Sequence, residues 1–155
     1  MKRRYLDIID NRKLLGIYEL NDDSLNISQE KKLIKILKKN IIKNDLILIA
    51  DYGHGLITKK VAKFLCTSSK FLALNAQVNS ANIGYSELKK YQKVDCLIIN
   101  ATELRHEMRE RDGQIDLLSK KLKKKIKCKS LTVTQGRAGL ITINSKNKIF
   151  KAPAF

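Results

Sequence analysis

Cys96-Leu-Ile-Ile-Asn-Ala-Thr-Glu103 joins a short apolar run directly to residues that favour the start of a helix. Consecutive apolar residues are typical of a strand that is covered on both sides, as in a parallel sheet. Asn100 can accept a hydrogen bond from the first helical turn, and Glu103 stands at the position that completes a capping box. The stretch therefore predicts a buried strand that passes straight into a helix.

The same pattern occurs on either side of this stretch. Upstream, the apolar run Leu46 to Ala50 leads into Asp51-Tyr-Gly-His-Gly55, and a helix that Thr58 can cap follows it. Downstream, Leu131-Thr-Val-Thr134 runs into Gln135-Gly-Arg-Ala-Gly139. Strands and helices that alternate with short connections predict an α/β fold with a doubly wound, mainly parallel sheet.

Helical spacing of apolar residues predicts two more helices, at 28–41 and 114–126, with Ser28 as the cap of the first, and the helix that follows Asn100 is expected at 101–110. A further strand is expected at 71–74. With these elements, strands and helices alternate along the chain from residue 28 to residue 134.

Two hairpins are expected near the ends of the chain. Strand-like stretches at 4–9 and 14–20 flank the turn former Asp10-Asn11. Near the other end, 140–143 and 148–150 are separated by a polar turn, and this pair is expected as an antiparallel hairpin at the edge of the sheet.

Composition limits the class of protein. A chain of 155 residues with 43% hydrophobic and 30% charged residues fits one globular domain, and its longest apolar runs are far too short to cross a bilayer. No secretion signal follows the basic start, so the chain is expected to be cytoplasmic. Cys66, Cys96 and Cys128 are far apart and odd in number, and are expected to be reduced, partly buried thiols.

The formal net charge of +17 raises the possibility of a nucleic-acid partner. However, 25 lysines stand against only 7 arginines, and aromatic residues make up only 6%. Arginine side chains and stacked aromatic rings are the usual contacts with nucleic acids. The excess of lysine is therefore interpreted as a compositional bias of the coding sequence rather than as a nucleic-acid-binding surface. The run Lys120 to Lys129 alternates with apolar residues and is interpreted as the solvated face of a helix.

Chemistry-bearing residues gather where the expected strands end, and ligands of open parallel sheets collect at that edge. Asn100 and Glu103 can serve only as a helix cap, or Glu103 can also hold Mg²⁺ through water while Asn100 contacts a phosphate. In Thr134-Gln-Gly136-Arg-Ala-Gly139, the glycines let the backbone approach a ligand, and the hydroxyl and N–H groups can bind phosphate or ribose. A plain strand connection is the alternative, because no Walker motif is present.

Asp51-Tyr-Gly-His-Gly55 is the weakest of the three motifs: a carboxylate followed by two glycines at a strand end. His54 has no serine or cysteine at a spacing that indicates a catalytic dyad, and His106 is expected on the surface.

Together the three turns resemble the ribokinase-like carbohydrate kinases of the PfkB family, in which N-x-x-E and T-x-G-x-x-G occur in this order. Asp51-Tyr-Gly-His-Gly55 looks like the D-Y-x-x-G stretch of the heptose kinase half of bifunctional ADP-heptose synthases. Lys2-Arg-Arg4-Tyr5 is similar to their K-x-R segment. Asn75-Ala-Gln-Val-Asn-Ser80 and Lys90-Tyr91 also look like a branch associated with lipopolysaccharide precursors. The resemblance spans essentially the whole chain.

The resemblance implies a transferase that uses ATP and Mg²⁺ to phosphorylate a sugar hydroxyl, with a heptose-type sugar as the expected substrate. It assigns the metal to Glu103, the nucleotide to Asn100, Thr134, Gly136 and Gly139, and the sugar to Lys2, Arg4 and Asp51. Residues 1–20 would be lid or edge strands, and 21–155 the nucleotide-binding α/β portion.

The resemblance covers only the middle portion of such a kinase. The D-x-x-G-A-G-D segment, which carries the catalytic base, would follow Pro153-Ala-Phe155, and the sugar-binding region would precede Met1. The chain alone is therefore expected to be inactive, and to self-associate or to need a complementing chain. A non-catalytic nucleotide-binding or assembly module and a basic nucleic-acid-binding domain remain as alternatives.

Overall fold

The computed structural model describes residues 2–19, 23–77 and 88–154. Its main feature is a six-stranded sheet whose strands lie side by side in the order in which they occur in the chain. The strands are β3 (Ile47–Asp51), β4 (Leu72–Ala76), β5 (Cys96–Asn100), β6 (Ser130–Thr134), β7 (Leu140–Ile143) and β8 (Ile149–Ala152). β3 to β6 are parallel, and β7 and β8 add an antiparallel hairpin. The prediction of a mainly parallel α/β sheet with an antiparallel edge hairpin is confirmed.

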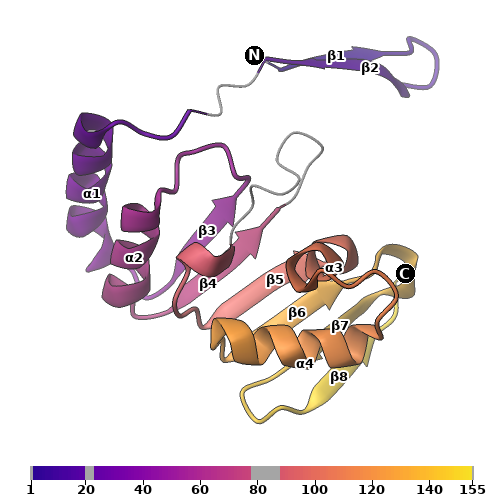
Figure 1. The fold of residues 1–155 in the computed structure, drawn as a ribbon. Helices are drawn as coiled ribbons and strands as arrows, with labels where there is room; N and C mark the ends of the chain where they lie inside the picture. Colours follow the sequence, from indigo (N-terminus) through magenta and orange to yellow (C-terminus); the bar gives the residue numbers. More distant parts are fainter. Residues whose placement is uncertain (1, 20–22, 78–87, 155) are drawn as a thin grey trace.

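The helices lie on one face of this sheet (Figure 1). They are α1 (Ile27–Ile41), α2 (Lys59–Ser68), α3 (Ala101–Met108) and α4 (Ile115–Ile126), with short 3₁₀ turns η1 (Leu88–Lys90) and η2 (Gly136–Ala138). Right-handed crossovers between strands in sequential order return to the same side of the sheet, which explains this placement. Within the described residues, the opposite face carries no helix, although a doubly wound sheet would have one there.

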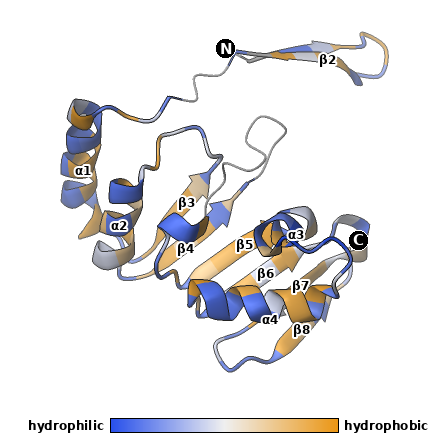
Figure 2. Ribbon diagram, viewed as in Figure 1, coloured by the Kyte–Doolittle hydropathy of each residue, from blue (hydrophilic) through white to orange (hydrophobic). Residues whose placement is uncertain are grey.

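The core lies between the helices and the sheet. Leu74, Leu97 and Leu131 come from three adjacent strands and are completely buried against helical residues such as Leu104 and Leu122. The ribbon coloured by hydropathy shows the same division, with apolar strands behind helices that carry polar outer surfaces (Figure 2). Burial alternates along β3, β5 and β6, so every second residue of these strands faces the helices.

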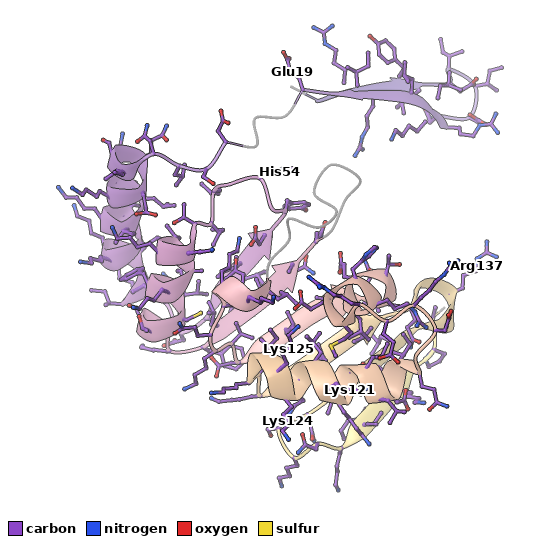
Figure 3. The ribbon with its side chains drawn as sticks, in the orientation of Figure 1. Glu19, His54, Lys121, Lys124, Lys125 and Arg137 are labelled. Carbon is purple, nitrogen blue, oxygen red and sulfur yellow. The ribbon has the colours of Figure 1, made fainter. Side chains whose placement is uncertain are left out.

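Helix α4 shows how the lysine-rich run is accommodated. Leu118, Leu122 and Ile126 are buried, whereas Lys121, Lys124 and Lys125 lie on the outer side of the helix (Figure 3). The interpretation as a solvated helix face is confirmed for the part of the run from Lys120 to Ile126, whereas Lys127 to Lys129 follow the end of α4.

Most helix boundaries agree with the sequence analysis, but the start of α1 does not. The cap is Asn26 rather than Ser28, and its side chain accepts a hydrogen bond from the N–H of Gln29 at 2.9 Å. The Gln29 side chain accepts one in return from the N–H of Asn26 at 3.0 Å. This reciprocal pair satisfies two backbone donors, and Ser28 has no Glu or Gln three residues later to do the same.

A separate two-stranded sheet precedes α1. β1 (Lys2–Leu6) pairs antiparallel with β2 (Lys13–Tyr18), so the predicted N-terminal hairpin is confirmed, with shorter strands than expected. Figure 1 shows it standing apart from the six-stranded sheet. Its apolar residues are exposed, and Ile8 and Ile9 at its tip are 96% and 90% exposed.

Two smaller findings complete the fold. Cys128 is buried, and Cys66 and Cys96 are half-buried, in agreement with the expectation of partly buried thiols. Among the described helices, none has the length and apolar content required to cross a membrane.

Candidate functional site at the carboxyl edge

Asn100 and Thr134 are direct neighbours at the carboxyl edge of the sheet. They are the last residues of β5 and β6, and they are register partners in the parallel ladder. Adjacent strands lie about 4.8 Å apart, so the start of α3 and the loop after β6 emerge side by side. The structure thus brings together two of the three motifs singled out in the sequence.

The start of α3 is a complete capping box. The Asn100 side chain accepts a hydrogen bond from the Glu103 N–H at 2.9 Å, and the Glu103 carboxylate accepts one from the Asn100 N–H at 2.6 Å. Glu103 is only 6% exposed. The structural interpretation of Asn100 and Glu103 is therefore correct, and a helix N-terminus with its partial positive charge faces this edge.

The metal-binding capacity of this edge is small. In the described ranges, no group of three or more His, Cys, Asp or Glu residues is arranged to hold a metal ion. Mg²⁺ often uses only one or two carboxylates together with water and phosphate oxygens. Glu103 fits that pattern as a single carboxylate beside a phosphate site, and it does not fit a metal site made of protein ligands alone.

The loop after β6 is held by its own backbone. The N–H of Gln135 donates to the carbonyl of Gly139 at 2.7 Å, and the N–H of Gly139 donates to the carbonyl of Gly136 at 3.0 Å. In the described part of the chain, the N–H groups of Gly136 and Arg137 have no hydrogen-bond acceptor. A short turn with two successive unused N–H groups is a geometry that can receive an anion.

The two glycines of this loop have different surroundings. Gly136 has φ of +56°, and a Cβ placed there would meet no atom within 4 Å. Gly139 has φ of +85°, and a Cβ there would lie 2.0 Å from the carbonyl oxygen of Ala152. Gly139 is therefore required by the close approach of the end of β8 and the residues that follow it, whereas the open space is beside Gly136.

Asp51, at the end of β3, is held by a buried network. Its carboxylate lies 2.7 Å from the Lys90 ammonium and accepts a hydrogen bond from the Tyr91 hydroxyl at 2.7 Å. The other oxygen accepts from the N–H of Gly53 at 2.9 Å. Lys90 also donates to the carbonyl of Ile57 at 2.9 Å. Both oxygens of Asp51 are therefore engaged within the protein.

The network shifts the titration of its members. Burial alone would raise the pKa of Asp51, but the hydrogen bonds from Lys90, Gly53 and Tyr91 outweigh it, so the pKa lies below its ordinary value. Burial, followed by the neighbouring charge of Asp51, raises the pKa of Tyr91. Asp51 is thus an ionised carboxylate and Tyr91 a neutral donor across the physiological range.

The remaining expected residues do not join this edge as one group. Lys2 and Arg4 are on β1 of the separate hairpin, so they are not brought next to Asp51. The rings of Tyr52 and His54 stack with centroids 6.4 Å apart. Figure 3 shows His54 and Arg137 on loops that leave the sheet at its carboxyl edge. Part of the expected stretch 75–80 lies outside the described residues.

Sequence reasoning missed the link between Asp51 and the pair Lys90 and Tyr91. A signal was available: an aspartate that ends a strand of apolar residues needs partners when it is buried. No local pattern identifies those partners, because they are about 40 residues further along the chain.

Comparison with known proteins supports a fold but no family. No family model matches the chain, and no curated protein sequence matches it. Among solved structures, ribokinase from Thermotoga maritima aligns with a TM-score of 0.66 and 17% identity over 99% of this chain and 48% of that one. Ribokinase from Giardia lamblia aligns with a TM-score of 0.66 and 13% identity over 99% of this chain and 48% of that one. Phosphofructokinase-2 from Escherichia coli, in complex with fructose-6-phosphate, aligns with a TM-score of 0.65 and 13% identity over 94% of this chain and 48% of that one.

The six-stranded sheet and its helices thus have the ribokinase-like α/β fold. The chain spans about half the length of these solved kinases.

Proposed function

We propose that this chain is the nucleotide-binding portion of an ATP-dependent carbohydrate kinase. One observation carries the proposal: Asn100 and Thr134 are register partners, so the N-terminus of α3 and the loop 135–139 share one edge of a ribokinase-like sheet. Helix N-termini and turns with unused N–H groups are where proteins bind phosphate.

In this proposal, the N–H groups of Gly136 and Arg137 receive phosphate oxygens, and the space beside Gly136 admits them. The exposed Thr134 hydroxyl donates to a phosphate or a ribose oxygen. Gly139 contributes indirectly, because its tight packing against Ala152 fixes the loop.

Glu103 and Asn100 are the residues that would hold Mg²⁺ and a phosphate oxygen. A magnesium ion bound there would neutralise charge on the phosphates. Glu103 would contact it through water, because one carboxylate oxygen already accepts the N–H of Asn100.

Transfer of the phosphate by the 155-residue chain alone is not expected. A base must orient the attacking hydroxyl. Of the two buried carboxylates that the structure describes at this edge, Asp51 is bound to Lys90, Tyr91 and Gly53, and Glu103 caps α3. Neither is placed to take a proton from a sugar.

For the sugar, we propose a heptose-type substrate, on the likeness of Asp51-Tyr-Gly-His-Gly55 to the corresponding heptose kinase stretch. The Asp51 network supports an indirect role for this residue, since its oxygens hold Lys90 and the turn at Gly53. Lys2 and Arg4 would contact the sugar only if the hairpin closes over the edge.

A non-catalytic nucleotide-binding module is the second candidate. It is favoured because Asp51 and Glu103 both accept hydrogen bonds from the protein itself. The two candidates differ in one outcome. The kinase portion should phosphorylate a heptose-type sugar when a complementing chain is supplied, whereas the binding module should not.

The Thr134→Val variant is expected to bind Mg-ATP at least about tenfold more weakly than the unchanged chain, because a hydrogen bond to a charged group is worth roughly 1.5–3 kcal/mol. Isothermal titration calorimetry measures this difference. Thr134 is exposed, so the substitution should leave the unfolding temperature unchanged.

Thr67→Val is the matched control, because Thr67 is an exposed threonine on α2 that bonds only to helix carbonyls. Equal Mg-ATP affinity in both variants and the unchanged chain would remove Thr134 from the site. No Mg-ATP binding by the unchanged chain would overturn the proposed function.

A further inference from the structure

The outer edge of β3 is an unprotected strand edge. β3 is the first strand of the sheet and pairs only with β4 among the described strands. The N–H of Ile47 donates to Phe71, and the carbonyl of Asp51 accepts from Gln77, so residues 47, 49 and 51 use their backbone groups toward β4. Backbone groups of successive residues alternate in direction, so the N–H and C=O of Leu48 and Ala50 point to the outer edge.

The two edges of the sheet differ in how they are protected. β8, at the opposite edge, carries Lys151 within the strand and is followed by Pro153. Lysine and proline are the residues that commonly prevent edge pairing. β3 carries neither, and Leu48 is 61% exposed on it. An apolar edge of this kind is a template for another strand.

The exposed surface of the chain is also larger than that of a compact monomer. The chain exposes 10968 Å². A compact monomer of 17.7 kDa exposes about 7,900 Å², so the excess is about 3,000 Å². Part of this excess belongs to the projecting hairpin and part to the uncovered face of the sheet. A specific dimer needs only about 800 Å² from each partner.

We propose that two copies of this chain pair antiparallel through their β3 edges, which joins the two sheets into one continuous sheet. A twofold axis at Ile49 places Leu48 of one copy opposite Ala50 of the other, and residues opposite each other in such a pair exchange both backbone hydrogen bonds. The edge groups of Leu48 and Ala50 are then satisfied in both copies.

The side chains fit the same register. Leu48 and Ala50 both lie on the uncovered face of the sheet, so a large side chain of one copy packs beside a small one of the other. Leu46 and Tyr52, which are 54% and 47% exposed, come opposite each other in this register. The dimer is closed, because pairing β3 with β3 leaves only the two protected β8 edges.

The charge of the chain sets the conditions for pairing. Each copy has a net charge of +17, so two copies repel each other over long distances. The screening length falls from about 30 Å at 0.01 M salt to about 10 Å at 0.1 M. The dimer fraction is therefore expected to rise with salt over this range.

The experiment is analytical ultracentrifugation of the full chain with Leu48→Lys as the test variant. The unchanged chain is expected to show a concentration-dependent monomer–dimer equilibrium, and Leu48→Lys to raise its Kd at least about tenfold, because apolar contact is replaced by two unpaired charges at the edge. Phe150→Lys is the matched control, since Phe150 is 54% exposed on the same face at the opposite edge. It should leave the dimer intact.

Hydrogen exchange on the unchanged chain provides a test that needs no variant. The amides of Leu48 and Ala50 should become protected as concentration rises. A monomer at all concentrations and salts would overturn the proposal. An equal loss of dimer in Leu48→Lys and Phe150→Lys would also overturn it, because that result would indicate stacking of the sheet faces. Assembly of the unchanged chain into open polymers would overturn it as well. Nucleotide binding is independent of this pairing, so the Mg-ATP titration and the ultracentrifugation can fail separately.

Discussion

Gly139→Val is expected to lower the free energy of unfolding by about 3–5 kcal/mol, which is a large share of the stability of a small domain. The reason is geometric. Gly139 has φ of +85° and ψ of −132°, a region that is almost restricted to glycine. The added Cβ would lie 2.0 Å from the carbonyl oxygen of Ala152 and 2.7 Å from the carbonyl carbon of Pro153. Because both atoms are backbone, β7 and the end of β8 would have to separate. Urea unfolding followed by circular dichroism measures the loss.

Gly136→Ala is the control for this result. Gly136 also has positive φ, at +56°, but no atom lies within 4 Å of the added Cβ. Only the backbone penalty of about 1–2 kcal/mol should appear. Equal losses in the two variants would show that the contact with the end of β8 does not decide the stability of this loop.

Lys90→Met is expected to destabilise the fold by about 3 kcal/mol, because it removes one partner of a mostly buried ion pair. The Lys90 and Asp51 side chains are 14% and 9% exposed and 2.7 Å apart. Without the ammonium, the carboxylate keeps only the hydrogen bonds of Tyr91 and Gly53, and the carbonyl of Ile57 loses a donor. The midpoint of urea unfolding at neutral pH measures this change.

The pH dependence of the same variant carries a definite sign. The pKa of Asp51 is lower in the folded chain than in the unfolded chain, because the bonds from Lys90, Gly53 and Tyr91 outweigh the effect of burial. A carboxyl group of this kind contributes stability above about pH 4, and the contribution is lost as the pH falls through the folded value. The difference between the unchanged chain and Lys90→Met should therefore shrink in acid.

Lys70→Met is the matched control, because Lys70 pairs with Asp45 at 2.8 Å on the exposed surface. Exposed pairs contribute little, so its unfolding midpoint should stay that of the unchanged chain. Equal urea midpoints for Lys90→Met and Lys70→Met at neutral pH would show that the ion pair between Lys90 and Asp51 does not stabilise the fold.

Local patterns predicted the parts of this fold that local physics determines. The caps at Thr58 and Asn100 follow from side chains that reach the first helical turn of their own segment. The error at Ser28 shows the limit of that reasoning, because Asn26 and Ser28 both favour a cap. Only Gln29, which completes a box with Asn26, distinguishes them.

Contacts between distant segments could not be predicted in the same way. Asp51 binds Lys90 and Tyr91 from a connection between two later strands, which no local pattern indicates, and its expected contact with a sugar stays a prediction. Gly139 lies against the end of β8 and the residues that follow it, which the sequence did not indicate, and its expected place in a nucleotide pocket stays a prediction. Periodicity carries no information on which segment will approach such a residue. The open edge of β3 likewise depends on strand order, which the sequence did not specify.

Calorimetric titration of Mg-ATP into Glu103→Gln shows whether the edge formed by Asn100 and Thr134 binds a magnesium nucleotide. Glutamine at this position should keep the cap, because Asn26 and Gln29 form the same box at the start of α1. The substitution therefore removes the charge of Glu103 while the helix start remains.

We expect Glu103→Gln to keep the unfolding temperature of the unchanged chain and to bind Mg-ATP about tenfold more weakly, while ATP alone binds equally to both chains. Mg-ATP binding of equal strength in both chains would contradict a metal role for Glu103, and a complete lack of ATP binding by the unchanged chain would contradict the site itself.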